Sequence, residues 1–287
     1  MTPSKIGPGG QAPFVEANGA RIPQRGFGTF QLRDDVCRKA VSAALDIGYR
    51  HIDTAAMYGN EVEVGESIRD SAIGRGEIFV TTKVWTDDIE ENALLASARA
   101  SLGRLRLEQV DLLLIHWPNR SIPLSSSIKG LCRARDEGLA AHIGVSNFPV
   151  ALLEQAVKLA AGHGHKLVAN QCENHPRLDQ SKVIAACEAH GIAFTSYSPL
   201  GRGDIVGDEV IGQIAKAHSR KPSQIILRWH LQQKIVAIPR SSTPGHIADN
   251  FAIDDFELTG SDIARISALH RANGRMVTPA FAPDWDV

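Results

Sequence analysis

Four side chains that could move protons follow three consecutive apolar segments of the sequence. Asp53 and Tyr58 follow the first, Lys83 ends the second and His116 ends the third. A buried lysine should pair with a neighbouring carboxylate, because neither charge tolerates burial alone. The ammonium should lower the pKa of the phenol, so that Tyr58 could act as a general acid while His116 orients the substrate or relays the proton. This chemistry suits protonation of a carbonyl oxygen; the hydride of a reduction must come from a cofactor.

Each of these residues taken singly has a structural explanation. A lone Tyr or His at a strand end is more often a packed side chain than a catalyst, and Asp53 with Lys83 could form a structural ion pair. Four such residues on three consecutive strand ends favour a catalytic group. A lyase with Lys83 as Schiff-base nucleophile is an alternative, but it needs an ammonium that loses its proton easily, which Asp53 would oppose.

The elements that must position these residues are eight short apolar segments separated by segments of 3.6-residue periodicity. The predicted strands span residues 26–30, 50–54, 78–85, 110–117, 142–147, 167–173, 193–198 and 235–240. Aliphatic strands that alternate with helices are typical of an α/β fold with a parallel sheet, and eight units in 287 residues favour a (β/α)8 TIM barrel. Active sites of such barrels lie at the carboxyl ends of the strands, where the four residues fall.

Local signals predict a hairpin and the ends of several helices. Asn18-Gly19 between alternating residues predicts an N-terminal β-hairpin over residues 14–22. Asn60 and Glu63 predict a capping box that opens a helix. The glycines expected to close helices are Gly103, Gly138 and Gly191. Further helices are predicted over 181–190 and 209–218, from Pro222 and from Thr259 with Asp262.

Composition and charge exclude several classes of partner. The chain has 31 Lys and Arg against 32 Asp and Glu, a net charge of −1, and no basic tract, so neither nucleic acid nor an acidic membrane is expected as a partner. No segment approaches the roughly 18 apolar residues of a membrane span. The four cysteines have no disulfide or metal-site spacing, and His163 and His165 have no third ligand nearby. We therefore expect a cytoplasmic monomer with free thiols and no metal, built as a flexible tail (1–13) and one barrel domain (14–287).

The absence of two nucleotide-binding motifs limits the kinds of cofactor site that this chain can have. Neither GxGxxG nor GxxxxGK[ST] occurs, so Rossmann and P-loop sites are not supported. Asn147 and Gln171 at strand ends could hydrogen-bond a carboxamide, and Tyr197 offers a ring for stacking. The segment 240–243 precedes a short helix, an arrangement that barrels use to hold phosphate. A nicotinamide dinucleotide across the barrel mouth would use all of these groups.

Segments spread over nearly the whole chain resemble the aldo-keto reductase family. They cover residues 26–30, 51–61, 82–85, 111–118, 143–148, 197–201 and 238–241. The resemblance implies NADPH-dependent reduction of small aldehydes and ketones, with Asp53, Tyr58, Lys83 and His116 as a tetrad and Tyr58 as proton donor. It implies cofactor contacts from Thr29, Asp53, Ser146, Asn147, Gln171, Tyr197, Ser198, Leu200, Arg240, Ser241, His246, Asp249 and Asn250. It also implies an apolar substrate pocket lined by Phe30, Trp85, His116 and Trp117.

The chain departs from the family pattern in two places. In the phosphate segment the family usually has Lys, Ser and then Arg five residues past that Ser, whereas this chain has Arg240, Ser241 and His246. Arg240 can still grip a 2′-phosphate, but a neutral His246 weakens the positive charge, so NADPH is expected and NADH is possible. The chain ends soon after Val277, as in bacterial members that reduce methylglyoxal or diketogluconate, which predicts an open pocket for small carbonyl compounds. A regulatory subunit that senses nucleotide with little turnover is the alternative from a non-enzyme class.

Overall fold

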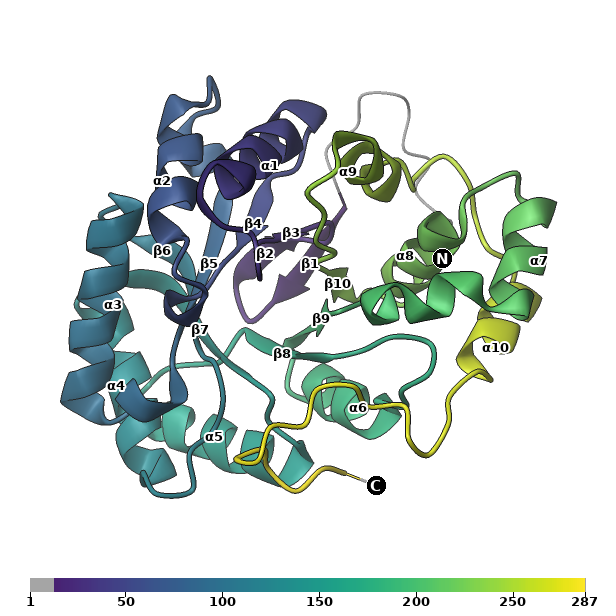
Figure 1. Cartoon of the computed structure of the whole chain (residues 1–287). Helices are drawn as coiled ribbons and strands as arrows, with labels where there is room; N and C mark the ends of the chain where they lie inside the picture. Colours follow the sequence, from purple (N-terminus) through teal and green to yellow (C-terminus); the bar gives the residue numbers. More distant parts are fainter. Residues whose placement is uncertain (1–12, 287) are drawn as a thin grey trace.

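The N-terminal hairpin has the predicted form. A computed structural model describes residues 13–286 (Figure 1). β1 (Phe14–Ala17) and β2 (Ala20–Pro23) pair antiparallel. Asn18 (φ 46°) and Gly19 (φ 93°) both have the positive φ that a tight hairpin turn of this hand requires. The predicted flexible tail lies outside the described residues except for Pro13, whose carbonyl accepts a hydrogen bond from the Gln24 amide.

Eight parallel strands follow and close into the predicted TIM barrel. They are β3 (Phe27–Gly28), β4 (His51–Asp53), β5 (Phe79–Val84), β6 (Val110–Ile115), β7 (Ala140–Ser146), β8 (Ala169–Glu173), β9 (Ala193–Tyr197) and β10 (Val236–Ala237). Each strand pairs with the next in chain order. A parallel bridge between Arg25 and Ala237 joins the two ends of the sheet. All eight predicted strands are confirmed.

Helices surround the strands, as Figure 1 shows. They are α1 (Asp34–Ile47), α2 (Glu61–Asp70), α3 (Glu91–Leu105), α4 (Leu124–Asp136), α5 (Val150–Gly162), α6 (Ser181–Ala189), α7 (Glu209–Ala217), α8 (Pro222–Gln232), α9 (Pro244–Phe251) and α10 (Gly260–Ser267). Short 3-10 helices lie in the loops: η1 (Ala56–Tyr58), η2 (Arg75–Glu77), η3 (Thr86–Asp88) and η4 (Gly201–Gly207). The last predicted helix begins at Thr259 as expected, and Thr259 and Asp262 form a capping box at the start of α10.

Two of the three glycines expected to end helices do so. Gly138 (φ 74°) and Gly191 (φ 64°) have left-handed backbone just past α4 and α6. The prediction for Gly103 is wrong: it lies within α3, and Arg106 (φ 54°) takes the left-handed position at the end of that helix. The apolar face of α3 continues past the glycine to Leu105, and its burial outweighs the weak helix propensity of glycine.

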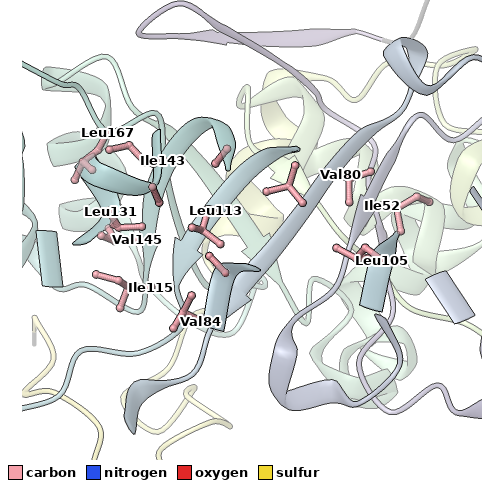
Figure 2. Packing of buried hydrophobic residues seen from close by; sticks show 14 of the residues in the cluster. Ile52, Val80, Val84, Leu105, Leu113, Ile115, Leu131, Ile143, Val145 and Leu167 are labelled. Carbon is pink, nitrogen blue, oxygen red and sulfur yellow. The ribbon is translucent and has the colours of Figure 1, made fainter. Parts of the chain in front are cut away.

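Side chains of the strands alternate between two cores. Aliphatic side chains on the outer face pack against the helices, and Figure 2 shows Ile52, Val80, Val84, Leu113, Ile115, Ile143 and Val145 in this layer. The inner face forms a second core in which Phe79, Leu112 and Leu114 pack with Ala17 and Ile22 of the hairpin. The hairpin therefore fills the amino-terminal end of the barrel. The opposite end is left for polar groups.

The sequence predicts free thiols for the cysteines and surface positions for His163 and His165. The four cysteines are free and buried, as expected. His163 is exposed, as expected for a surface residue. His165 is half-buried, and its Nε2 lies 2.9 Å from the Asp136 carboxylate. Within residues 13–286, no helix is long and apolar enough to cross a membrane.

We expect Gly65→Ala to destabilise the fold, because a Cβ at Gly65 in α2 would lie 2.2 Å from the Leu105 carbonyl oxygen. Overpacking of this kind costs about 1–3 kcal/mol, against roughly 1 kcal/mol gained from helix propensity. The matched control is Gly103→Ala in α3, where nothing lies within 4 Å of the added carbon. Urea unfolding of both variants measures the difference; equal midpoints would contradict it.

Candidate active site

The Lys83 ammonium lies at the carboxyl end of β5 with three oxygen acceptors around it. Nζ donates to Asp53 Oδ1 at 2.5 Å, to the Thr54 carbonyl at 2.8 Å and to the Tyr58 hydroxyl at 3.4 Å. The second Asp53 oxygen, Oδ2, accepts from Gln171 Nε2 at 2.7 Å. Lys83 is 0% exposed and Asp53 1% exposed. The pair is stable when buried because every ammonium proton has an acceptor and both carboxylate oxygens are bonded.

Strand register brings these groups together. Asp53 on β4 pairs with Thr81 on β5, and Lys83 follows two residues later on the same face. His51, two residues before Asp53, places Nε2 3.1 Å from the Thr81 hydroxyl below the ion pair. Tyr58 comes from η1, the 3-10 turn that directly follows β4. Neighbouring parallel strands thus deliver a carboxylate, an ammonium and a phenol to one end of the barrel.

Asn60 holds the Tyr58 loop in place, which is not the role its sequence context predicts. It lies at the start of α2 but makes no side-chain cap. Its amide instead donates to the Thr29 and Leu32 carbonyls at 2.8 and 3.0 Å, and its oxygen accepts from Thr54 Oγ1 at 2.8 Å. The predicted capping box is therefore wrong. The buried side chain makes three hydrogen bonds to neighbouring loops, which stabilise the fold more than a single exposed capping bond would.

Burial raises the pKa of Tyr58 above the ordinary value, and the sequence-based expectation of a lowered pKa is wrong in this respect. Desolvation is the largest effect; Lys83 opposes it, and Asp53 adds to it. The reason is that Lys83 does not act as a lone cation, since its charge is matched by Asp53. Tyr58 therefore carries its proton at neutral pH, in the form that a proton donor requires.

The protonation states of Lys83 and His116 follow from the same surroundings. Burial alone would lower the pKa of Lys83, but Asp53 and Tyr58 outweigh it and the pKa lies above its ordinary value. A stabilised ammonium is a poor nucleophile, which disfavours the Schiff-base alternative. Burial, and secondly Lys83, hold the pKa of His116 well below its usual range. The neutral His116 ring lies edge-on to Tyr58, with centroids 5.6 Å apart, and its Nδ1 has no partner within residues 13–286.

The groups expected to hold a carboxamide, and Tyr197, expected to stack on a ring, form one hydrogen-bonded network beside the tetrad. The Tyr197 hydroxyl donates to Asn147 Oδ1 at 2.8 Å, and Asn147 Nδ2 donates to the His116 carbonyl at 2.9 Å. Ser146 Oγ donates to the Gln171 carbonyl at 2.7 Å. Gln171 also contacts Asp53, as described above. The structure thus links Ser146, Asn147, Gln171 and Tyr197 to the tetrad.

Other expected cofactor residues lie in loops around the same end. The Thr29 hydroxyl donates to the Asp53 carbonyl at 3.0 Å. Ser198 (φ 50°) begins the loop after β9, and Leu200, half-buried, packs against the cluster formed by α7, α8 and α10. Thr29 is therefore close to the tetrad. For Ser198 and Leu200 a cofactor contact stays a prediction.

The expected phosphate segment lies around the start of α9. Arg240 is exposed and its Nη2 donates to Gln31 Oε1 at 3.0 Å, across the closure of the barrel. Ser241 Oγ accepts from the Thr243 amide, and His246 is exposed on the first turns of α9. Asp249 instead pairs with Lys221 Nζ at 2.5 Å. Asn250 is 6% exposed. Asp249 is thus occupied by a structural ion pair, whereas Arg240 and His246 face solvent.

The apolar pocket contains the predicted aromatic residues and two that sequence reasoning missed, Phe281 and Trp285. Phe30 lies 5.0 Å from Tyr58 and Trp85 lies 5.2 Å from His116, both between ring centroids. Phe281 packs edge-on against Trp85 and Trp117, at 5.8 Å from each. The C-terminal segment therefore packs against Trp85 and Trp117, and the open pocket expected from the sequence stays a prediction. No periodic pattern marks residues 274–286, and only their aromatic content could have signalled a role.

A cavity of about 870 Å³ adjoins this side of the site. It is lined by Trp85, Thr86, Asp87, Asn119, Arg120, Ser121 and residues 278–285. Its walls thus come from the loops after β5 and β6 and from the C-terminal segment. The cavity gives the aromatic side of the site room for a ligand of small-molecule size.

Fold and site together define a TIM barrel with a buried Asp-Lys-Tyr-His group at the carboxyl ends of its strands. A family-wide comparison matches residues 26–271 to the Aldo/keto reductase family. The chain belongs to this family of oxidoreductases, which use nicotinamide cofactors.

Individual relatives are similar over almost their full length. Methylglyoxal reductase DkgB of Escherichia coli O157:H7 is 40% identical over 268 residues, which cover 92% of this chain and 99% of the relative. Glyoxal reductase of Bacillus subtilis strain 168 is 40% identical over 255 residues, covering 88% and 91%. A crystal structure of a candidate 2,5-diketo-D-gluconic acid reductase B superposes with a TM-score of 0.94 at 40% identity, covering 96% and 98%. An aldo/keto reductase from Brucella melitensis gives 0.85 at 41% identity, covering 90% and 100%.

We expect no tyrosinate to form in the folded protein as the pH rises through 10. The chain has three tyrosines, and burial raises the pKa of Tyr49, Tyr58 and Tyr197 above the ordinary value of about 10. Ultraviolet absorbance of the tyrosinate measures this, with the urea-unfolded chain as control, which should titrate near 10. A rise of about one third of the full amplitude below pH 10, lost in Tyr58→Phe, would show that Lys83 lowers the pKa of Tyr58 after all.

Proposed function

We propose that this protein reduces small aldehydes and ketones to alcohols with a nicotinamide cofactor, and that Tyr58 is the proton donor. The observation that carries the proposal is the Tyr58 hydroxyl held 3.4 Å from the buried Lys83 ammonium and beside a neutral His116. Of the three described tyrosines, only Tyr58 has its hydroxyl within hydrogen-bond distance of a cation; the other two bond a carbonyl and an amide oxygen.

Each residue of the tetrad has a separate task in this reaction. When bound, the nicotinamide supplies a hydride to the carbonyl carbon. Tyr58 gives its proton to the carbonyl oxygen, which becomes a stronger base than the phenolate as negative charge develops on it. Lys83 stabilises the phenolate that remains, and Asp53 keeps Lys83 in place. The neutral His116 ring orients the carbonyl oxygen through a hydrogen bond.

The residues present fit a nicotinamide dinucleotide. The amides of Asn147 and Gln171 lie beside the tetrad and could bond a carboxamide, while the half-buried Tyr197 ring offers a stacking face. At the start of α9, a Cβ on Gly245 would meet nothing within 4 Å, so no side chain fills the space beside this helix start. Arg240 would bind the 2′-phosphate of NADPH, our preferred cofactor, with support from the helix N-terminus.

The substrates we propose are small and partly apolar carbonyl compounds. The rings of Phe30, Trp85, Trp117 and Phe281 surround the approach to Tyr58 and His116. The names of the relatives, methylglyoxal reductase and glyoxal reductase, support short 2-oxoaldehydes as the first compounds to test. The four free thiols support a reducing compartment, the cytoplasm, as the site of action.

We predict that Tyr58→Phe lowers kcat for methylglyoxal by about 10²–10⁴-fold while the dissociation constant for NADPH stays unchanged, because only the transferable proton is lost. Steady-state kinetics and NADPH fluorescence titration measure the two quantities. Tyr49→Phe is the matched control, since Tyr49 is buried against Phe27 and Phe251 on the outer face of the barrel.

Near-normal turnover in Tyr58→Phe would exclude Tyr58 as the acid. If instead the wild-type protein binds NADPH tightly but turns over no carbonyl compound in a broad panel, the nucleotide-sensing alternative is favoured. A stable complex with another chain would strengthen that second conclusion.

We predict that Arg240→Ala raises the KM for NADPH at least about tenfold, the equivalent of ~1.4 kcal/mol for a lost charge-assisted contact, with little change for NADH. Only NADPH carries the additional phosphate. Parallel kinetics with both cofactors measure the ratio, and Arg21→Ala, an exposed arginine of the hairpin, is the control. Equal effects on both cofactors would remove Arg240 from the phosphate site.

A further inference from the structure

Glu173, at the carboxyl end of β8, has a fully buried carboxylate that the reaction does not use. It is 0% exposed. Oε1 accepts from His175 Nε2 at 3.0 Å and from the Met276 amide at 2.7 Å, and Oε2 accepts from the Val277 amide at 2.9 Å. Two of these three donors belong to the backbone of the C-terminal segment, about a hundred residues further along the chain.

The segment that Glu173 holds, residues 274–286, is fastened at both ends; we call it the C-terminal loop. The Arg275 guanidinium lies 3.7 Å from the centroid of the Trp285 ring, so the two ends of the loop contact each other. Asp286 Oδ2 accepts from the Val150 amide at the start of α5 at 2.8 Å. Figure 1 shows this segment, in yellow, running from α10 past α6 toward α5.

Between these two ends the C-terminal loop supplies one wall of the substrate side of the site. Phe281 contacts Trp85 and Trp117, and Trp285 contacts Trp117 at 6.0 Å between centroids. Residues 278–285 line the cavity of about 870 Å³. The position of this wall relative to His116 therefore depends on where the loop leaves the barrel, at Met276 and Val277.

We propose that Glu173 is a positioning residue that sets substrate specificity by anchoring the C-terminal loop, so that Phe281 and Trp285 complete the pocket for carbonyl compounds with an aromatic or other bulky apolar group. This inference rests on the proposed function and concerns one side of the same site. Short 2-oxoaldehydes lack such a group, so we expect their reduction to depend little on Glu173.

The hydrogen bonds to Glu173 are strong enough for this role. Bonds to an ionised acceptor contribute more than neutral ones, and a buried donor left without a partner carries the whole cost of its desolvation. Arg275 also depends on this carboxylate: burial lowers the pKa of Arg275, and the Glu173 charge is the main effect opposing it. Glu173→Gln keeps the size of the side chain but turns an amide NH₂ toward a backbone N–H donor or toward His175. The loop should therefore detach at Met276 and Val277 while the barrel stays folded.

The kinetic test compares Glu173→Gln with Phe281→Ala. For 4-nitrobenzaldehyde we expect Glu173→Gln to raise KM by about 2- to 10-fold, the value of an aromatic contact, with kcat unchanged. For methylglyoxal we expect both constants to stay the same. Phe281→Ala should raise the KM for 4-nitrobenzaldehyde similarly, and the double variant should be no worse than the poorer single variant, because both remove the same contact.

A second readout needs no activity. The Met276 amide is bound to Glu173, so trypsin should cleave after Arg275 faster in Glu173→Gln than in the wild-type chain. Gly274→Ala gives an independent route to the same state, since a Cβ there would lie 1.8 Å from the Arg177 carbonyl oxygen and must shift the loop. Gly103→Ala is the matched control. Gly274→Ala also answers the question if Glu173→Gln does not fold.

The results separate this proposal from the proposed function. A wild-type protein that reduces neither aldehyde contradicts the proposed function, while the trypsin result still reports on the anchor. Additive KM effects in the double variant, or equal losses of kcat for both aldehydes, would overturn the specificity role of Glu173. Unchanged cleavage after Arg275 in both Glu173→Gln and Gly274→Ala would overturn the anchor itself.

Discussion

The ion pair between Lys83 and Asp53 is the constraint around which the rest of the site is arranged. Two opposite charges taken out of water lose more solvation than their attraction returns unless every remaining lone pair and proton is also bonded. Here the pair has three further partners, Thr54, Tyr58 and Gln171. Only a closed barrel brings the ends of β4, β5 and β8 near enough for this. The buried ion pair therefore depends on the closed fold.

The same pairing explains why the phenol keeps its proton. A solitary ammonium would draw the Tyr58 pKa down, but a lysine already matched by a carboxylate offers a dipole instead of a net charge, and desolvation prevails. Such an acid is weak at rest and becomes effective only when a strongly basic oxygen develops within reach. His116, which burial keeps neutral, adds no charge that would upset this balance.

Much of the architecture follows from local sequence, and what escapes prediction depends on tertiary contacts. The strands are readable because their aliphatic side chains are buried on both faces, and Asp53, Lys83 and His116 stand out as polar groups where such segments end. Asn60 has the sequence context of a helix cap, yet distant carbonyls take its amide protons. Phe281 and Trp285 carry no periodic signal, because their aromatic partners, Trp85 and Trp117, lie in loops more than 150 residues away in the chain. The direction of the Tyr58 pKa likewise depends on packing that no spacing of residues reveals.

The hairpin closes the amino-terminal end of the barrel, so only the carboxyl-terminal end is open. Ala17 and Ile22 fill its base with Phe79 and Leu112, and Asn18 fastens the turn to the Leu167 and His190 carbonyls at 2.8 and 3.0 Å. A ligand must then enter and leave at the carboxyl-terminal end of the barrel, where the loops lie. Substitutions in those loops can change substrate specificity without weakening the packing around the hairpin. Substitutions in the hairpin should change the stability of the fold and leave substrate specificity unchanged.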